Sequence, residues 1–394
     1  MGHDGMMRGF PPPPEHQVTL ANWREAGFNG WAFHHVREVL PTANVSRGDG
    51  AVRELTRRPV DCDAVAFEDA QGRETTIGRF LADSATDGVI VLHEGRVIFE
   101  RYDNGMTPET PHILFSVTKS VAATLTGIVA DQGRLDPDAP VTDYVPEVAG
   151  SAYGDATVRH LLDMTVGVQF VEDYEDATGD FARYRLATGW LPANEKSATD
   201  GLRKFLPTLR KAGDHGDAFH YVSPNTDLLG WVLERATDIP FAELLSREIW
   251  RPMGAERDAY IALDPFGAPR AAGGLCMTLR DLARFGQMHL EHGLANGHRI
   301  VPAWWLVDLR ENGDPAAWAK GGYESMPDWR YRSKWYIAPD GAYCGLGIHG
   351  QTVFVDPAAN LVAAKFSSQP SALDEALDAT TAKAWHAIAE ALNG

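Results

Sequence analysis

The clearest pattern of apolar and polar positions lies between Ser116 and Gly133. Its apolar residues recur at the spacing of one helical face, and Gly133 suits the left-handed cap at which a helix ends. Those residues are Val117, Val121, Leu125, Ile128 and Val129. The pattern predicts a buried helix that begins directly after Ser116.

Runs of residues that favour strands occur towards both ends of the chain. Residues 89–92 and 97–99 flank a short turn containing Gly95, which predicts a β-hairpin. In the C-terminal part, a helix is expected from Leu279 to His292, ending at Gly293. The strands predicted after it are 343–348, 352–355 and 361–366, and a last helix follows over about 373–392.

The middle of the chain has a helical pattern. It starts at Thr157, after a connection rich in Pro and Asp, and runs to about Arg257. A second helical pattern, from Trp23 to Val45, carries aromatic residues that could pack on the rest of the fold. Residues 1–17 include four consecutive prolines and are expected to form a flexible arm.

This order of elements predicts an α/β (α+β) fold in which both ends of the chain build one antiparallel sheet flanked by helices. Residues 18–135 and 258–394 would form this discontinuous domain, and residues 136–257 a helical domain. A cleft between the two domains is the expected place for a binding site.

Composition limits the classes of function. The chain has 394 residues, of which 44% are hydrophobic, and its formal net charge is -18. This acidic balance disfavours nucleic acid or an anionic membrane as a partner. Cys62, Cys276 and Cys344 are too widely spaced for a disulfide framework or a Cys-x-x-Cys metal site. With neither a signal-peptide pattern nor an apolar stretch of membrane-spanning length, the expected location is the cytoplasm.

Ser116 and Lys119 are the candidate reactive pair. Residues three apart share a helix face, so the Lys119 amine can reach the Ser116 hydroxyl. Burial would lower the pKa of this Lys, which makes its neutral amine a general base beside a nucleophile. Free N–H groups at the start of the helix would stabilise a developing oxyanion. The alternative, in which both residues belong to a solvated polar face, stays open on this motif alone.

Two other kinds of site are disfavoured. A Ser-His-Asp triad lacks the Gly-x-Ser-x-Gly turn that usually presents its serine. Zinc binding by His289, Glu291, His292 and His298 is not expected, because the first and third lie in a last helical turn, where His favours the helix dipole. The sequence therefore predicts no metal and no other cofactor.

Several longer motifs resemble one family. The order and spacing of five segments are similar to class C β-lactamase-like serine hydrolases: FSVTKS, GRLDPDAPVTDYVPEV, TVRHLLDMTVGV, YVSPNTDLLGWVLERATDIPFAELL and AAGGLCMTLRDLARFGQMHLEHG. NWREAGFNGWAFHHVREVLPTANVSR and GLGIHGQTVFVDP resemble the nylon-oligomer hydrolases within it, and family VIII carboxylesterases are also similar. The resemblance spans about residues 18 to 370 and implies a β-lactamase/penicillin-binding-protein-like fold.

The resemblance implies Ser116 as the acylated nucleophile and Lys119 as its base. The second motif of the family, Tyr-x-Asn or Tyr-x-Ser, matches Tyr221, with Ser223 expected to support Lys119 or Tyr221. A Tyr beside a cationic Lys should have a lowered pKa and could pass a proton to the leaving group. A competing match at Tyr331 lacks the Asn-Thr-Asp-Leu-Leu-Gly context that follows Ser223.

The third family motif, Lys-Thr-Gly, is replaced here by Gly345-Leu346-Gly347. The Ile348 N–H would then be the second oxyanion donor, opposite the Ser116 N–H. A shifted register that aligns His349-Gly350 with the motif is the alternative, and His349 is a candidate substrate contact.

The remaining candidate contacts also come from the resemblance. Tyr174 matches a tyrosine that closes over the substrate amide, and Tyr336 is expected to line the cleft. Trp190 could line the cleft or pack in the core. Arg185 and Ala272 stand where efficient nylon-dimer hydrolases carry an Asp that meets the substrate ammonium and an assisting Asn. Arg185 would repel an ammonium and attract a carboxylate, which favours ester substrates.

Two hypotheses follow. In the first, the protein is a serine hydrolase that cleaves an amide or a short-chain ester through Ser116, with only a small molecule as partner. In the second, it is a non-hydrolytic relative that binds a peptide-like ligand. The joint presence of Ser116, Lys119 and Tyr221 favours the first. Whether two copies form a homodimer is left open by the sequence.

Overall fold

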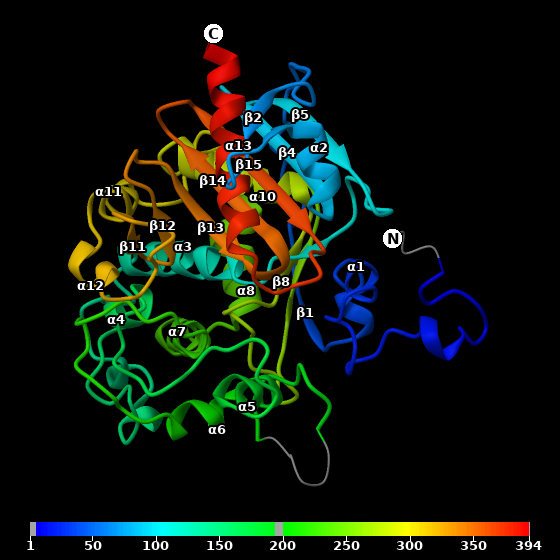
Figure 1. Cartoon of the computed structure of the whole chain (residues 1–394). Coiled ribbons are helices and arrows are strands. Elements are labelled where there is room, and N and C mark those ends of the chain that lie inside the picture. Colours follow the sequence, from blue (N-terminus) through cyan, green and yellow to red (C-terminus); the bar gives the residue numbers. More distant parts are fainter. Residues whose placement is uncertain (1–4, 194–199, 394) are drawn as a thin grey trace.

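The fold centres on a seven-stranded antiparallel sheet with the order β11-β12-β13-β14-β15-β4-β5 (Figure 1). The structure is a computed structural model that describes residues 5–193 and 200–393. The strands are β4 (Thr86–His93), β5 (Arg96–Tyr102), β11 (Arg330–Arg332), β12 (Trp335–Ile337), β13 (Tyr343–Gly347), β14 (Gln351–Asp356) and β15 (Leu361–Ser367). Strand β15 pairs with β4, so the sheet joins the two ends of the chain, as the sequence predicts.

Helices cover both faces of this sheet. Val89 and Val91 of β4 pack in the cluster that contains α2 (Ile77–Asp83) and α13 (Glu375–Asn393). Their neighbours Ile90 and Leu92 point to the other face, where α3 (Val117–Asp131) and α10 (Leu279–Leu290) lie. The alternation of strand side chains thus divides the core into two layers, which explains why β4 is buried throughout.

A smaller antiparallel sheet, in the order β1-β7-β8-β6, leads into the reactive helix. Its strands are β1 (Thr42–Val45), β6 (His112–Ile113), β7 (Ala259–Ala262) and β8 (Leu275–Met277). Because β6 ends three residues before Ser116, its pairing with β8 fixes where α3 begins.

The helical pattern from Trp23 to Val45 does not form one helix of that length. This region holds only α1 (Asn29–Ala32), the 3-10 turn η2 (Val36–Glu38) and β1. Its aromatic residues pack instead around Phe115: the ring centres of Trp23 and Phe33 lie 6.2 and 4.9 Å from that ring. Tertiary packing has overridden the local helical periodicity.

The middle of the chain folds into short helices beneath α3 (Figure 1). Helix α7 packs against both α3 and α4. The elements are η3 (Val141–Asp143), η4 (Pro146–Val148), α4 (Val158–Leu162), α5 (Asp180–Ala187), α6 (Leu202–Phe205), η5 (Leu206–Thr208), α7 (Pro224–Thr237), α8 (Phe241–Leu245), the π-helical turn η6 (Ser246–Trp250) and α9 (Arg251–Met253).

The remaining elements lie at the periphery. They are β2 (Ala66–Glu68), β3 (Glu74–Thr76), β9 (Leu294–Ala295), β10 (His298–Arg299), α11 (Ala303–Glu311), α12 (Pro315–Ala319) and the 3-10 turn η7 (Ile348–Gly350). Of the predicted arm, residues 1–4 lie outside the described residues, and 5–17 contain the single 3-10 turn η1 (Pro14–His16) and project from the body in Figure 1.

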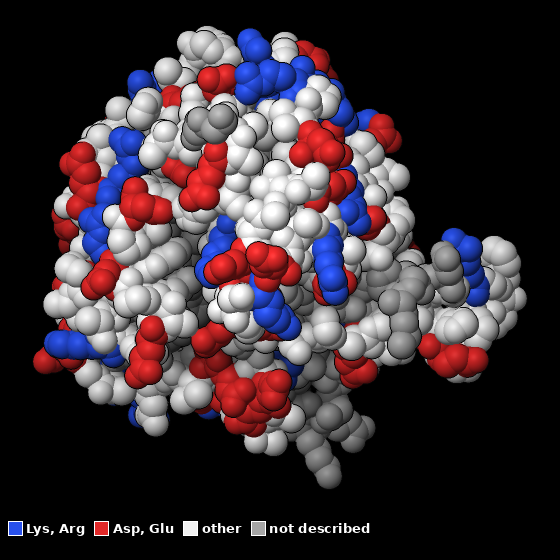
Figure 2. Space-filling view, turned by 45° about the horizontal axis from the view of Figure 1, so that its top comes forward, with Lys and Arg blue, Asp and Glu red and all other residues white. Residues whose placement is uncertain are grey.

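Figure 2 shows how charge is distributed on one face of the molecule. On the face seen in Figure 2, acidic and basic side chains are interspersed among neutral residues.

Among the helices of residues 5–193 and 200–393, none combines the length and the apolar character that a bilayer span requires.

Candidate active site

The chain presents Ser116 through a sharp turn between β6 and α3. Phe115 has a φ of 43°, in the left-handed region that bulky residues rarely adopt, and Ser116 is the N-cap of α3. The turn is held by the Leu114 N–H, which donates to the Leu275 carbonyl at 2.9 Å. Backbone strain maintained by surrounding structure at such a point is a common property of functional sites.

Lys119 faces Ser116 across one turn of α3. Its Nζ donates to Ser116 Oγ at 2.8 Å and to the Ala272 carbonyl at 2.7 Å. Burial lowers the pKa of Lys119 to about 8, although the charges of Glu172 and Asp227 oppose this shift. A substantial fraction of the amine is therefore neutral near pH 8, as a general base requires.

A buried network that sequence reasoning missed fixes the carbonyl partner of Lys119. The Ala272 N–H donates to Asp227 Oδ1 at 2.8 Å. The other oxygen, Asp227 Oδ2, accepts hydrogen bonds from the Arg270 guanidinium and the Tyr184 hydroxyl. Asp227 is the Asp of the Asn-Thr-Asp segment that follows Ser223, so the motif context held a signal for it. Asp227 and Arg270 are positioning residues in this arrangement.

Tyr221 also joins the Ser116–Lys119 pair. Lys119 Nζ lies 5.0 Å from the centre of the Tyr221 ring, and the Ser116 side chain acts to lower the pKa of Tyr221. The expected lowering of its pKa is wrong. Burial, together with the charge of Glu172, raises the pKa of Tyr221 well above its ordinary value, so the phenol stays protonated.

A second residue that sequence reasoning missed is Glu172, which accepts hydrogen bonds from Ser223 and Tyr174. It accepts from the Ser223 N–H at 2.6 Å, from Ser223 Oγ at 2.7 Å and from the Tyr174 hydroxyl at 2.7 Å. Ser223 Oγ therefore donates to Glu172, not to Lys119 or Tyr221 as expected. No local pattern distinguished Glu172 from the other acidic residues of its loop.

The predicted oxyanion donors lie at two helix starts. Ser116 precedes the first residue of α3 and Ile348 is the first residue of η7, and N–H groups at such positions have no partner within their own helix. A Cβ on Gly347 would lie 2.6 Å from the Leu114 carbonyl and 3.1 Å from the Ser116 nitrogen. Only glycine thus lets the end of β13 approach the nucleophile this closely.

Several of these residues line a narrow cavity of about 20 Å³. Ser116, Ile348 and the candidate contacts Tyr174, Arg185 and Ala272 all line it. The other lining residues are Arg24, Phe115, Glu172, Phe181, Tyr184, Trp190, Ser223, Arg270 and Gly273. Trp190 was expected either to line the cleft or to pack in the core. It does both, because it lines the cavity and also packs in a core cluster.

Two candidate substrate contacts are not part of this lining. Tyr336 is buried in β12, with its ring edge-on to Tyr331 at 4.8 Å between ring centres. His349 packs on Phe33 and Phe115, its Nδ1 lies 2.7 Å from the Gln369 carbonyl, and burial lowers its pKa to about 4. His349 is thus a neutral side chain that packs beside the Ile348 turn, and a substrate contact by either residue stays a prediction.

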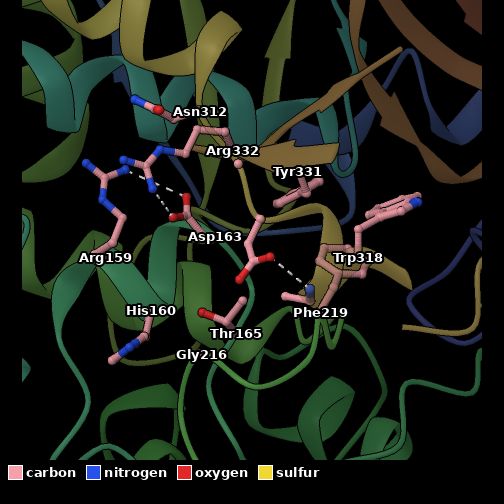
Figure 3. Close-up of a pocket in the computed structure, with 13 residues that line it drawn as sticks. Arg159, His160, Asp163, Thr165, Gly216, Phe219, Asn312, Trp318, Tyr331 and Arg332 are labelled. Atoms are coloured by element: carbon pink, nitrogen blue, oxygen red, sulfur yellow. Dashed lines mark hydrogen bonds and ion pairs between the residues drawn. The ribbon is translucent and has the colours of Figure 1, made fainter. Parts of the chain in front are cut away.

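A second, larger cavity has an aromatic lining on one side. It measures about 400 Å³, and Phe219, Trp318 and Tyr331 form one side of it (Figure 3). The competing motif match falls here: Tyr331 lines this cavity, and Ser333 Oγ accepts from Arg159 Nη1 at 3.0 Å. Among the interactions of the described residues, none joins Tyr331 to Ser116 or Lys119, which leaves Tyr221 as the match beside the reactive pair.

Two histidine clusters bear on metal binding. His289 is a buried core residue, and its Nε2 lies 3.0 Å from Thr124 Oγ1. The structure also brings together His34, Asp87 and His112, which the sequence did not connect. Asp87 is hydrogen bonded to His112 Nε2 at 3.1 Å and accepts from Ser368 Oγ at 3.0 Å, so this buried carboxylate ties β4 to β6.

Comparison with known families decides the classification. A family model described as Beta-lactamase matches residues 74–387. The chain belongs to the beta-lactamase family. This confirms the resemblance and the fold class that the sequence predicts, and it makes the chain a hydrolase of this family.

Individual relatives refine the picture. A 6-aminohexanoate-dimer hydrolase from Paenarthrobacter ureafaciens is 38% identical over 364 residues, which cover 92% of this chain and 91% of the relative. The structure of a candidate 6-aminohexanoate-dimer hydrolase from Bacillus anthracis superposes with a TM-score of 0.89 and 27% identity, covering 97% of this chain and 98% of that one. A family VIII carboxylesterase shares the fold at a TM-score of 0.55 and 18% identity, covering 79% of this chain and 95% of the other.

Proposed function

We propose that this protein is a serine hydrolase that cleaves an amide or a short-chain ester bond through an acyl-enzyme on Ser116. The observation that carries the proposal is the 2.8 Å contact between Ser116 Oγ and Lys119 Nζ, a buried amine with a pKa of about 8. A binding protein would gain nothing from a neutral amine beside a serine, so the non-hydrolytic alternative is disfavoured.

Acylation would begin when Ser116 Oγ attacks the substrate carbonyl carbon and its proton passes to the neutral Lys119 amine. The oxyanion that forms is stabilised by the N–H groups of Ser116 and Ile348. As the carbon–nitrogen or carbon–oxygen bond breaks, Tyr221 gives its proton to the leaving group and regains one from the Lys119 ammonium. Water then attacks the ester on Ser116 by the same steps in reverse order, with Lys119 as the base.

The substrate class is supported by the relatives. The similarity to the 6-aminohexanoate-dimer hydrolase favours amides that resemble 6-aminohexanoate oligomers. Arg185 in the cavity lining favours the second candidate, a carboxylesterase with little amidase activity, because it would repel the ammonium of a linear 6-aminohexanoate dimer.

The test is kcat/KM for the linear 6-aminohexanoate dimer and for p-nitrophenyl butyrate, in the wild type and in Ser116→Ala. We expect Ser116→Ala to lower cleavage of every accepted substrate by a factor on the order of 10⁴, because the nucleophile is lost. Ser120→Ala is the matched control: Ser120 lies one turn further along α3, and its hydroxyl donates to the Lys334 carbonyl outside the cavity. Turnover that survives Ser116→Ala would contradict the proposal.

A further inference from the structure

Three arginines converge on the cavity that contains Ser116, and they differ in how they are paired. Arg24 precedes α1, Arg185 lies in the last turn of α5, and Arg270 lies between β7 and β8. Arg270 is neutralised, because its guanidinium donates to Asp227 and, at 2.8 Å, to the Tyr184 hydroxyl. The other two guanidinium groups are the unusual ones.

Arg24 and Arg185 have no carboxylate partner among the described residues. Arg185 Nε is buried and donates to no acceptor, and its guanidinium lies 5.5 Å from the centre of the Phe181 ring. Burial and the neighbouring charge of Arg185 lower the pKa of Arg24 to about 9. Two like charges held together in a partly desolvated site are unfavourable unless an anion joins them.

Three acidic residues, Glu172, Asp227 and Asp176, already accept hydrogen bonds from other donors. Glu172 accepts from Ser223 and Tyr174, and Asp227 accepts from Ala272, Arg270 and Tyr184. Asp176 accepts from the N–H groups of Thr178 and Gly179 at the start of α5. Among the described residues, no carboxylate therefore forms an ion pair with either guanidinium group, and the charge of Asp176 acts on Arg185 without such a contact.

We propose that Arg24 and Arg185 bind a carboxylate of the substrate, so that the enzyme prefers anionic esters or amides to neutral and cationic ones. This inference rests on the proposed function and names its substrate class. A guanidinium presents two parallel N–H donors that match the planar carboxylate, and Arg185 Nε is one donor that this carboxylate would satisfy. Because both arginines line the cavity of Ser116, the bound anion and the scissile bond belong to one molecule.

The test compares esters that differ only in charge. On the acyl side, these are mono-4-nitrophenyl adipate, 4-nitrophenyl hexanoate and 4-nitrophenyl 6-aminohexanoate. On the leaving-group side, they are 4-carboxyphenyl butyrate and 4-carbamoylphenyl butyrate. We expect kcat/KM for the anionic ester to exceed that for its neutral partner by at least about tenfold in one of the two sets, which also identifies the side that carries the carboxylate. The cationic ester should be the poorest of its set.

Variants assign this preference to the two arginines. Arg24→Gln and Arg185→Gln should each bring the ratio of anionic to neutral kcat/KM towards one, and Arg185→Glu should favour the cationic ester. Arg183→Gln is the matched control, because Arg183 is an exposed arginine of the same helix that pairs with Asp180 at 3.2 Å. A preference for neutral esters in both sets, or an anionic preference that survives the double Arg24→Gln/Arg185→Gln change, would overturn the inference.

A binding measurement separates this inference from the proposed function. Calorimetry with Ser116→Ala needs no turnover: monomethyl adipate should bind to it more tightly than methyl hexanoate, and the difference should vanish when Arg185→Gln is added. If hydrolysis depends on Ser116 but neither binding nor kcat/KM responds to charge, the carboxylate site is wrong and the hydrolase stands. If binding responds to charge but no ester is cleaved, the hydrolase is wrong and the anion site stands.

Discussion

The narrow cavity that contains Ser116 and the larger cavity lined by Phe219, Trp318 and Tyr331 differ in how their charged side chains are paired. The larger one, of about 400 Å³, contains a fully paired arginine: Arg332 donates to Asp163 at 2.6 Å (Figure 3) and also to Asp308 at 2.7 and 2.8 Å. The narrow cavity, of about 20 Å³, is lined by Ser116, whose Oγ contacts Lys119 Nζ, and by two arginines that form no ion pair with a carboxylate among the described residues.

This difference shows that volume is a poor guide to the reactive site in this molecule. Paired charges such as Arg332 and Asp163 stabilise a fold and have little capacity left for a ligand. A buried amine with a lowered pKa and unpaired guanidinium groups retain that capacity. We therefore place the chemistry in the narrow cavity, which must widen to admit a substrate because its volume holds about one water molecule.

The largest expected effect comes from the base in the narrow cavity. Lys119→Ala should lower kcat/KM by a factor on the order of 10³, because no other amine contacts Ser116 Oγ among the described residues. Lys365→Met is the control: Lys365 is another buried lysine with a pKa lowered to about 8 by burial, but its Nζ donates to Ser367 Oγ in the sheet. If kcat/KM fell equally in the two variants, both measured as folded protein, the loss in Lys119→Ala could not be assigned to the loss of a base beside Ser116.

A moderate effect is expected from pH. Lys119 must be neutral to accept the Ser116 proton, and its pKa is lowered to about 8, so activity should be lost as pH falls through that value. Between pH 8 and pH 6, kcat/KM should fall about fiftyfold, from half neutral to about one per cent neutral. In Lys365→Met, kcat/KM should show the same fall between pH 8 and pH 6. A profile that is flat from pH 6 to 9 would contradict the role of Lys119.

The smallest effect is expected in the larger cavity. Asn312→Ala removes a lining side chain whose Nδ2 donates to Asp308 Oδ1 at 2.9 Å. The change lies outside the reactive cavity, so kcat/KM should stay within about twofold of the wild-type value, as is usual for exposed polar substitutions. A loss of tenfold or more in steady-state assays would show that the two cavities are coupled and that the comparison is too simple.

The sequence predicted the parts of the fold that depend on local pattern. The helix after Ser116 forms as α3, and Gly133 has the left-handed φ of 70° that its position at the helix end required. The hairpin of β4 and β5 and the last strands also appear where strand propensity placed them. The Trp23–Val45 region failed because its aromatic residues pack on Phe115, and periodicity carries no information about such distant contacts.

The candidate site was predictable only in part for a similar reason. Ser116 and Lys119 are three residues apart, so helix geometry alone could bring them together. Glu172, Asp227 and Arg270 act through contacts that span many residues, and a single sequence does not reveal which acids and bases will meet. The pKa of Tyr221 was misjudged because burial and the charge of Glu172 raise it, and Lys119, which was expected to lower it, is itself partly neutral near pH 8.

The most direct test of the account is to locate the acylated residue. The protein would be treated with a fluorophosphonate that carries an ester-like group, digested, and analysed by mass spectrometry, with Ser116→Ala in parallel. The account predicts one adduct, on Ser116, formed more slowly in Lys119→Ala and absent from Ser116→Ala. Labelling of a different residue, or an unlabelled Ser116 in a protein that still cleaves substrate, would contradict it.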